Sequence, residues 1–254
     1  MSITDSEKEK KILIDLHCHI LPGIDDGALS LSESLIMAQS AAGGGTRKIV
    51  ATPHYFNDYQ NPKPVSKDEV KKKFKELKDF LKLNRSPVEL YMGAEQYGVS
   101  NIASIIENDE LITINDSRYL LIEFSLDDDI ERAKFVLSQL DEYDIVPVLA
   151  HPERYDFIQE EPSKIFWFLQ HGCLLQVNKG SITGRFGEEA EGVSHWLIRE
   201  RMAHLVASDS HGPYQRTADM SAALQYALYS CGDEYADELF NENPQRILDD
   251  ELID

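Results

Sequence analysis

Seven short apolar segments of strand length alternate with segments of helical periodicity along this chain of 254 residues. We expect the strands at residues 12–16, 48–52, 88–92, 119–124, 145–150, 173–177 and 204–207. Strands that alternate with helices pair in parallel, and near-continuous apolar strands are buried on both faces. Because no linker or change in composition divides the chain, the pattern favours one closed or nearly closed α/β barrel over a doubly wound sheet.

The segments between these strands carry helix start and stop signals. Ser30 or Ser32 can cap a helix that ends at glycines 43–45, and Ser66 opens a second helix whose lysine-rich face we interpret as solvated surface. Residues 55–64, rich in Asn and Pro, predict a loop long enough to act as a lid or binding loop. Further helices are expected at residues 127–143, 163–171 and 188–201, with one or two more across the barrel bottom between residues 217 and 248.

The first expected strand runs directly into His17 and His19, which are soon followed by Asp25 and Asp26. Side chains at i and i+2 of an extended strand point to the same side, so the two histidines could bind one ion. Imidazole suits Zn, Fe and Mn, whereas carboxylates suit Mn and Mg. Taken alone, this segment could equally be a polar strand end with an Asp-Asp-Gly turn.

Six of the seven expected strands end in titratable residues, namely His17, His19, Asp25, Asp26, His54, Glu95, Glu123, His151, Asp209 and His211. The carboxyl ends of parallel barrel strands face one mouth, so these side chains would converge on one pocket. Singly, His54 and His151 could be core histidines beside proline, and Asp209 and His211 could cap a helix. Gathered carboxylates repel one another unless cations hold them together, so the coincidence favours a polynuclear metal site.

Composition excludes several classes of protein. With 45 acidic and 25 basic residues, the formal charge of −20 makes nucleic acid a poor partner. The cysteines, Cys18, Cys173 and Cys231, show no CxxC spacing and no Cys-x5-Arg phosphatase loop, which fits a reducing cytoplasm. The polar N-terminus and the short apolar run after it predict neither a signal peptide nor a membrane span. Dinucleotide, Walker and Gly-x-Ser-x-Gly motifs are also missing from the sequence.

Five motifs follow one another along the chain: Asp15-x-His17-x-His19, Thr52-Pro-His54, Gly93-x-Glu95, His151-Pro-Glu-Arg154 and Ser208-Asp209-x-His211. Together they resemble the polymerase and histidinol phosphatase (PHP) superfamily of metal-dependent phosphoesterases. More narrowly, His-Ile-Leu-Pro-Gly-Ile-Asp-Asp-Gly, Ala-His-Pro-Glu-Arg and Gly-Ser-Ile-Thr-Gly-Arg-Phe-Gly look like the bacterial tyrosine-protein phosphatases of capsule and exopolysaccharide operons. The match runs in order from about Lys11 to Leu248.

The resemblance implies a fold and a metal centre. The fold would be a distorted, TIM-like (β/α)7 barrel formed by one domain, residues 12–254, after a polar extension, residues 1–11. The centre would hold three divalent ions, usually taken as manganese, with iron, zinc or magnesium as the other candidates. The ligands carried over are His17, His19, Glu95 and Asp209 for the first ion, the shared Glu95 with Glu123 and His151 for the second, and Asp26, His54 and His211 for the third.

The resemblance also implies a substrate site. Arg154 and Arg216 would contact the phosphate, because the planar guanidinium suits that anion. Arg185, in the Thr-Gly-Arg-Phe-Gly segment, could either bind the phosphate or only brace its loop. The implied activity is metal-dependent hydrolysis of phosphotyrosine in the tail of a bacterial tyrosine kinase, in exopolysaccharide or capsule regulation.

Other functions remain open from the sequence. A small-molecule phosphatase of the histidinol-phosphate type is the first alternative, and a non-enzymatic metal-binding or kinase-scaffolding protein is the second. Exonuclease activity is disfavoured by the charge of −20. We expect a cytoplasmic protein that does not insert into the membrane, and the sequence does not fix its oligomeric state.

Overall fold

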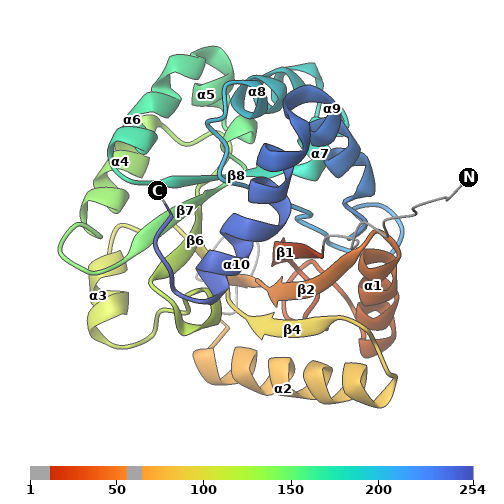
Figure 1. The fold of residues 1–254 in the computed structure, drawn as a ribbon. Coiled ribbons are helices and arrows are strands. Elements are labelled where there is room, and N and C mark those ends of the chain that lie inside the picture. Colours follow the sequence, from red (N-terminus) through yellow and green to blue (C-terminus); the bar gives the residue numbers. More distant parts are fainter. Residues whose placement is uncertain (1–11, 56–64, 254) are drawn as a thin grey trace, which may run out of the picture.

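The computed structural model describes residues 12–55 and 65–253, and Figure 1 shows its strands surrounded by helices. The expected N-terminal extension, residues 1–11, and all but Tyr55 of the expected loop 55–64 lie outside the described residues. The strands are β1 (Leu13–Cys18), β2 (Thr46–Ala51), β3 (His54–Tyr55), β4 (Glu89–Met92), β5 (Glu95–Tyr97), β6 (Tyr119–Glu123), β7 (Val146–Ala150), β8 (Leu174–Asn178) and β9 (Leu205–Ala207).

Two of the seven predicted strands, 48–52 and 88–92, are each followed after a short break by a second, shorter strand. The chain leaves β2 at Thr52–Pro53 and resumes as β3, and it leaves β4 at Gly93–Ala94 and resumes as β5. Proline lacks the N–H that a strand ladder needs, so the regular ladder is interrupted at Pro53, although the Pro53 carbonyl still accepts from the Glu95 N–H at 2.9 Å. The pieces keep the same neighbours, because β2 pairs with β4 and β3 pairs with β5, always in parallel. The sequence patterns did not predict the two short strands β3 and β5.

Hydrogen bonds join the two sheets into a ring of parallel strands. One sheet has the order β1-β2-β4 and the other β3-β5-β6-β7-β8-β9. The first and last strands meet through a bridge between Cys18 and Ser210, where the His19 N–H donates to the Ser210 carbonyl at 2.9 Å. The Asp209 N–H likewise donates to the His17 carbonyl at 2.8 Å. The expected distorted α/β barrel is therefore confirmed.

Helices cover the outside of the ring (Figure 1), and they are α1 (Leu31–Gly43), α2 (Lys67–Leu83), α3 (Ile102–Glu107), α4 (Ile130–Ser138), α5 (Asp156–Glu160), α6 (Ile165–Gln170), α7 (Lys179–Ile182), α8 (Glu188–Arg199), α9 (Ser221–Asp237) and α10 (Asn243–Leu248). Side-chain oxygens of Ser30 and Ser66 cap α1 and α2, as expected. Helix α4 begins later than the predicted 127–143, because Asp129 accepts hydrogen bonds from the Glu131 and Arg132 N–H groups and starts the helix there, and it also ends earlier, at Ser138. No helix in the described ranges is long and apolar enough to cross a bilayer.

Shorter turns complete the chain: the 3-10 turns η1 (Ile114–Asp116), η2 (Pro152–Arg154) and η3 (Pro162–Lys164), and the π-helical turn η4 (Glu238–Glu242) between α9 and α10. Of these, η2 matters most for function, because it follows β7 directly and carries Arg154 away from the end of that strand.

The C-terminal segment closes the end of the barrel where the strands begin, as the sequence predicted for the tail. Ile247 and Leu248 of α10 pack into the same buried cluster as Ile14 of β1 and Leu121 of β6. The Tyr119 hydroxyl at the start of β6 donates to the Glu251 carbonyl at 2.7 Å. In Figure 1, α10 lies across the strands. The polar side chains that follow the strands lie at the opposite end of the barrel, where the strands finish.

Replacing Ile247 by Ala should lower the free energy of unfolding by about 2–5 kcal/mol, because it opens a cavity in a fully buried cluster. Urea unfolding followed by circular dichroism measures this. Leu252→Ala is the matched control, since that side chain is 65% exposed and its loss should cost about 0.5 kcal/mol or less. Equal effects of the two substitutions would contradict the placement of α10 against the barrel.

Candidate active site

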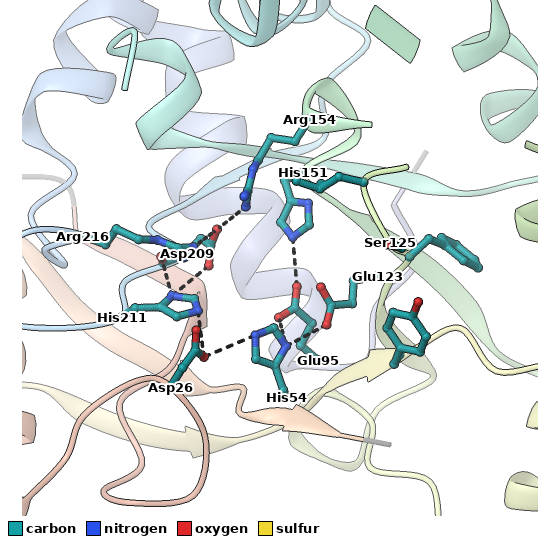
Figure 2. Close-up of a pocket in the computed structure, with 13 residues that line it drawn as sticks. Asp26, His54, Glu95, Glu123, Ser125, His151, Arg154, Asp209, His211 and Arg216 are labelled. Carbon is teal, nitrogen blue, oxygen red and sulfur yellow. Dashed lines mark hydrogen bonds and ion pairs between the residues drawn. The ribbon is translucent and has the colours of Figure 1, made fainter. Parts of the chain in front are cut away.

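A cavity of about 310 Å³ opens where the parallel strands end (Figure 2). Arg154 and Arg216 line it together with Tyr97, Phe124 and Leu126. Seven of the expected metal ligands also line it: Asp26, His54, Glu95, Glu123, His151, Asp209 and His211. The other two, His17 and His19, are fully buried. The structure thus brings all nine expected ligands to one end of the barrel, as the strand-end pattern predicts.

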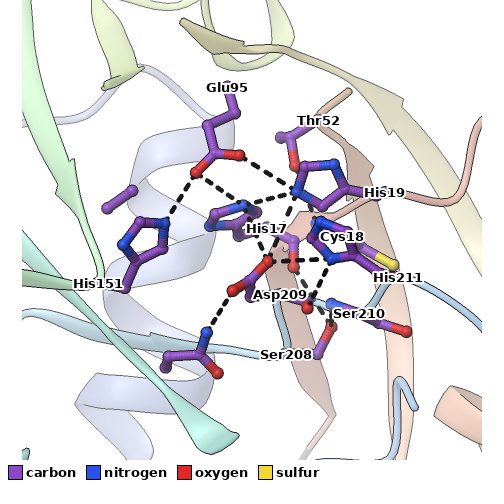
Figure 3. A network of polar contacts seen from close by, with 12 residues as sticks. His17, Cys18, His19, Thr52, Glu95, His151, Ser208, Asp209, Ser210 and His211 are labelled. Carbon is purple, nitrogen blue, oxygen red and sulfur yellow. Dashed lines mark hydrogen bonds and ion pairs between the residues drawn. The ribbon is translucent and has the colours of Figure 1, made fainter. Parts of the chain in front are cut away.

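The ligands expected for the first ion converge from three separate parts of the barrel (Figure 3). The Nε2 atoms of His17 and His19 lie 3.1 Å apart, and each is 3.2 Å from an oxygen of Glu95. Asp209 Oδ1 is 3.6 Å from the same two nitrogens. These four side chains could therefore bind a single ion.

Glu95 also connects the first group to the second. His151 Nε2 lies 3.1 Å from Glu95 Oε1, so the carboxylate contacts this imidazole as well as His17 and His19. Glu123 lies across from it, with Oε1 2.7 Å from His54 Nδ1. The side chains of His54, Glu95 and Glu123 lie close enough to share one ion.

The ligands expected for the third ion meet at Asp26. Its Oδ1 lies 3.5 Å from His54 Nε2 and 3.4 Å from His211 Nε2. His19 is close enough to contribute to the same group. His54 therefore stands between the second and third groups, with Nδ1 towards Glu123 and Nε2 towards Asp26. The expected ligands therefore form groups that share residues, and not three separate sets.

Two of these expected ligands have strained backbone conformations. His151 has φ 36° and ψ 54°, and Asp209 has φ 48°. This left-handed region is uncommon for residues other than glycine, and occupying it costs roughly 1–3 kcal/mol. Each residue follows a regular strand, β7 or β9, and the side chains of both line the cavity. Such strain at a strand end is typical of a functional site.

Partners behind the histidines orient the rings. His17 Nδ1 lies 2.7 Å from Gln176 Oε1, and His19 Nδ1 lies 2.8 Å from Asp25 Oδ2. Each Nδ1–H can donate to its oxygen partner, which leaves the Nε2 lone pair pointing at the cluster. Asp25, which the sequence placed among the strand-end carboxylates, thus orients the expected ligand His19, and it also accepts from the His54 backbone N–H at 3.0 Å.

Gln176 and Asn178 contact the expected ligands, although the sequence patterns did not predict them as site residues. Gln176 is fully buried in the apolar strand β8, and Asn178 donates through Nδ2 to Asp209 Oδ2. The signal that could have found them is an amide side chain at each of two alternate positions, Gln176 and Asn178, in an otherwise apolar strand. Buried amides need partners, and here the partners are His17 and Asp209, two of the expected ligands.

Electrostatics support a cation site. Burial by itself raises the pKa of Glu95, but His17 and His54 outweigh it and bring the pKa well below its ordinary value. Burial lowers the pKa of His54, yet Glu123 and Glu95 raise it well above its ordinary value. For His19, Asp25 overcomes burial and raises the pKa to about 9. The carboxylates therefore create a field that attracts positive charge.

The donor atoms fit divalent metal ions. With protons on Nδ1, the Nε2 lone pairs of His17 and His19 face the oxygens of Glu95 at 3.2 Å. Glu95 Oε2 and Glu123 Oε1 are buried and receive no hydrogen bond of regular geometry from any described residue. Facing lone pairs repel unless a proton or a metal ion lies between them, and a set of imidazoles and carboxylates suits Mn, Fe or Zn.

The two expected phosphate-binding arginines meet at Asp209 (Figure 2). Arg154 Nη1 lies 3.3 Å from Asp209 Oδ2, and Arg216 Nη2 lies 2.5 Å from the same oxygen. Arg154 comes from η2, and Arg216 comes from the loop after β9. Arg185 is exposed and stands outside the set of described residues that line the cavity.

The parallel barrel and the imidazole–carboxylate centre at its mouth are the fold and site of the metal-dependent α/β-barrel hydrolases. Within that class, the chain belongs to the CpsB/CapC family of capsular polysaccharide synthesis, whose pattern matches residues 13–249. The resemblance seen in the sequence is thereby confirmed.

Relatives extend over nearly the whole chain. Tyrosine-protein phosphatase YwqE of Bacillus subtilis is 33% identical over 95% of this chain and 93% of the relative. Tyrosine-protein phosphatase CpsB of Streptococcus pneumoniae is 30% identical over 95% of this chain and 100% of the relative. A crystal structure from a study of YwqE and CpsB, which calls them unique metal-dependent tyrosine phosphatases, matches this chain with a TM-score of 0.89 and 32% identity. The match covers 95% of this chain and 96% of the chain in that structure. The phosphotriesterase homology protein of Escherichia coli, at 11% identity and TM-score 0.58 over 92% and 97% of the two chains, shares the fold alone.

Changing Glu95 to Gln should remove most of the bound metal while leaving the fold intact. Glutamine keeps the size of the side chain but lacks the negative charge that four imidazoles contact. Elemental analysis of gently purified protein measures the metal, and circular dichroism checks the fold. Glu131→Gln, at a mostly exposed carboxylate of α4, is the matched control and should keep its metal. Full occupancy in the Glu95 variant would contradict the central role of this carboxylate.

Proposed function

We propose that this chain is a metal-dependent protein-tyrosine phosphatase whose substrate is the phosphotyrosine tail of a bacterial tyrosine kinase. The observation that carries the proposal is the convergence of Arg154 and Arg216 on Asp209, beside the carboxylate–imidazole cluster. Cations and guanidinium groups on one side of a cavity suit a dianionic phosphate monoester. The relatives named as tyrosine-protein phosphatases support the choice of substrate.

Nine side chains would hold three divalent ions, with manganese as our first choice and iron, zinc or magnesium as alternatives. They are His17, His19, Asp26, His54, Glu95, Glu123, His151, Asp209 and His211. Bound there, such ions supply Lewis acidity, neutralise phosphate charge and provide a water nucleophile at neutral pH.

The arginines bind and orient the substrate in this proposal. Arg154 and Arg216 approach Asp209 from different loops, and both side chains line the cavity. Both can therefore donate N–H groups to a phosphate bound there. Arg216 Nε is buried and has no hydrogen-bond partner within residues 12–55 and 65–253. An unpaired buried donor beside the cavity is suited to an anionic oxygen. A phenolate is a good leaving group, so the site needs no strong general acid.

A cysteine nucleophile has no support in the structure. Burial raises the pKa of the Cys173 thiol to about 12, and burial also raises the pKa of Cys231. The thiolate is the nucleophilic form, so these groups are unreactive at neutral pH. All three cysteines are free, which supports our placement of the protein in the reducing cytoplasm.

The remaining wall of the cavity favours an aromatic substrate over the histidinol-phosphate alternative. Tyr97, Phe124 and Leu126 line the cavity, and in Figure 2 their neighbour Ser125 lies on the side opposite Arg216. An apolar wall across from the phosphate-binding groups can contact a phenyl ring. Histidinol phosphate would bring a smaller, more polar ring and a hydrated amino group to that wall, so it would bury less apolar surface there.

Purified protein should hydrolyse a phosphotyrosine peptide, lose this activity on chelation, and regain it with added Mn²⁺. Release of phosphate from the peptide and from histidinol phosphate is compared at equal concentration. We expect the peptide to have the higher kcat/KM. Cys173→Ser is the matched control and should keep substantial activity through the same cycle.

Two outcomes would contradict the proposal. Turnover of histidinol phosphate with a higher kcat/KM than the peptide would favour the small-molecule alternative. Metal-replete protein that binds phosphate but turns over neither substrate would favour a binding or scaffolding protein instead.

Arg154→Ala and Arg216→Ala should each lower kcat/KM on the peptide roughly ten- to hundred-fold, the value of a lost charge-assisted contact. Metal content should stay normal, because arginine does not ligate cations. Lysine at either position should restore activity only in part, since it lacks the planar fork. Arg185→Ala is the control, because Arg185 is exposed outside the cavity, and it should change kcat/KM by less than about two-fold. A larger effect at Arg185 than at Arg154 would overturn this assignment.

A further inference from the structure

We propose that Phe186 is a positioning residue that holds Arg154 and Arg216 together in the arrangement that binds phosphate. This inference rests on the proposed function, in which the two arginines contact the phosphate. Phe186 lies in the loop between α7 and α8, the segment whose Gly-Ser-Ile-Thr-Gly-Arg-Phe-Gly motif the phosphatase reaction has so far left without a role.

One aromatic ring contacts both guanidinium groups. Arg154 Cζ lies 4.3 Å from the centre of the Phe186 ring, and Arg216 Cζ lies 5.6 Å from the same centre. Both distances are within the range in which a cation is attracted by the negative face of an aromatic ring. The ring therefore stabilises two like charges that would otherwise repel each other.

The arginines need such a partner because their other shared contact is already in use. Both donate to Asp209 Oδ2, which also accepts from Asn178 Nδ2. Asp209 is also a proposed metal ligand, so metal ions compete for its electron density. Phe186 has no lone pairs to offer a metal. It can therefore hold both guanidinium groups whether or not Asp209 is engaged elsewhere.

The local sequence makes room for the ring. A Cβ atom on Gly180 would lie 2.5 Å from Phe186 Cε2, so only glycine leaves the ring in this place. The Arg185 N–H donates to the Gly180 carbonyl at 2.9 Å, which folds the loop back over α7. Gly184 and Gly187, with φ of 74° and 97°, allow the turns on either side of the Arg185–Phe186 pair. The conformation of the whole motif thus directs Phe186 at the arginines.

Phe186 acts through the arginines in this proposal and does not itself contact the substrate, because it stands outside the described residues that line the cavity. A purely structural residue could be replaced by any side chain of similar volume. A positioning residue that works through its ring face should instead distinguish aromatic from aliphatic replacements. This difference gives the proposal its test.

The test measures binding of inorganic phosphate to metal-loaded protein by calorimetry, alongside kcat and KM on a phosphotyrosine peptide. Phe186→Leu should weaken phosphate binding and lower kcat/KM by roughly three- to ten-fold, with normal metal content and thermal stability. Phe186→Tyr should remain within about two-fold of the unmodified protein, because it keeps the ring face. Gly180→Ala, which displaces the ring without removing it, should shift phosphate binding in the same direction as Phe186→Leu.

Phe135→Leu is the matched control, because it removes an aromatic ring that is 57% exposed on α4, and it should leave phosphate binding unchanged. Equal phosphate affinity in the Leu and Tyr variants at position 186 would overturn the role of Phe186. The proposed function fails separately, if the unmodified metal-loaded protein hydrolyses no phosphotyrosine peptide. In that case calorimetry with phosphate still decides whether Phe186 positions the arginines.

Discussion

The buried carboxylate of Glu95 is the interaction on which the rest of the site depends. Its two oxygens lie 3.0 to 3.2 Å from nitrogens of His17, His19, His54 and His151. A carboxylate that is only 1% exposed is stable only with positive charge around it. The four imidazoles come from the ends of three different barrel strands. Closure of the barrel is therefore what gathers these imidazoles around Glu95, and with them the candidate metal site.

Breaks in two strands put Glu95 and His54 in place. After Pro53 and after Gly93–Ala94 the chain resumes as β3 and β5, in which His54 pairs directly with Glu95. A Cβ on Gly93 would lie 2.8 Å from Val50 Cγ1, so the close approach of the two strands at this break needs glycine. Regular, unbroken strands would have directed the side chains differently. The irregularity of the barrel is thus part of how the site is built.

The molecule separates stability from chemistry along the barrel axis. At one end, Ile247 and Leu248 close the interior with apolar contacts, and at the other end strained residues such as His151 and Asp209 direct polar side chains into a cavity. Loops beyond that end add the arginines and Phe186, which meet although they come from different loops. This division is common in parallel barrels, because the core packs among the strands while the loops are free to carry function.

The sequence by itself determined the alternation of strands and helices, and it determined which acids and histidines follow strand ends. Those features are local, since periodicity and the ends of apolar runs depend only on residues that are close together in the sequence. Only the tertiary structure decided that Asp25 supports His19, that Gln176 orients His17, and that Phe186 contacts two arginines. It also decided the short strands β3 and β5. Most of these are relations between segments far apart in the chain, and they exist only because the strands close into one ring.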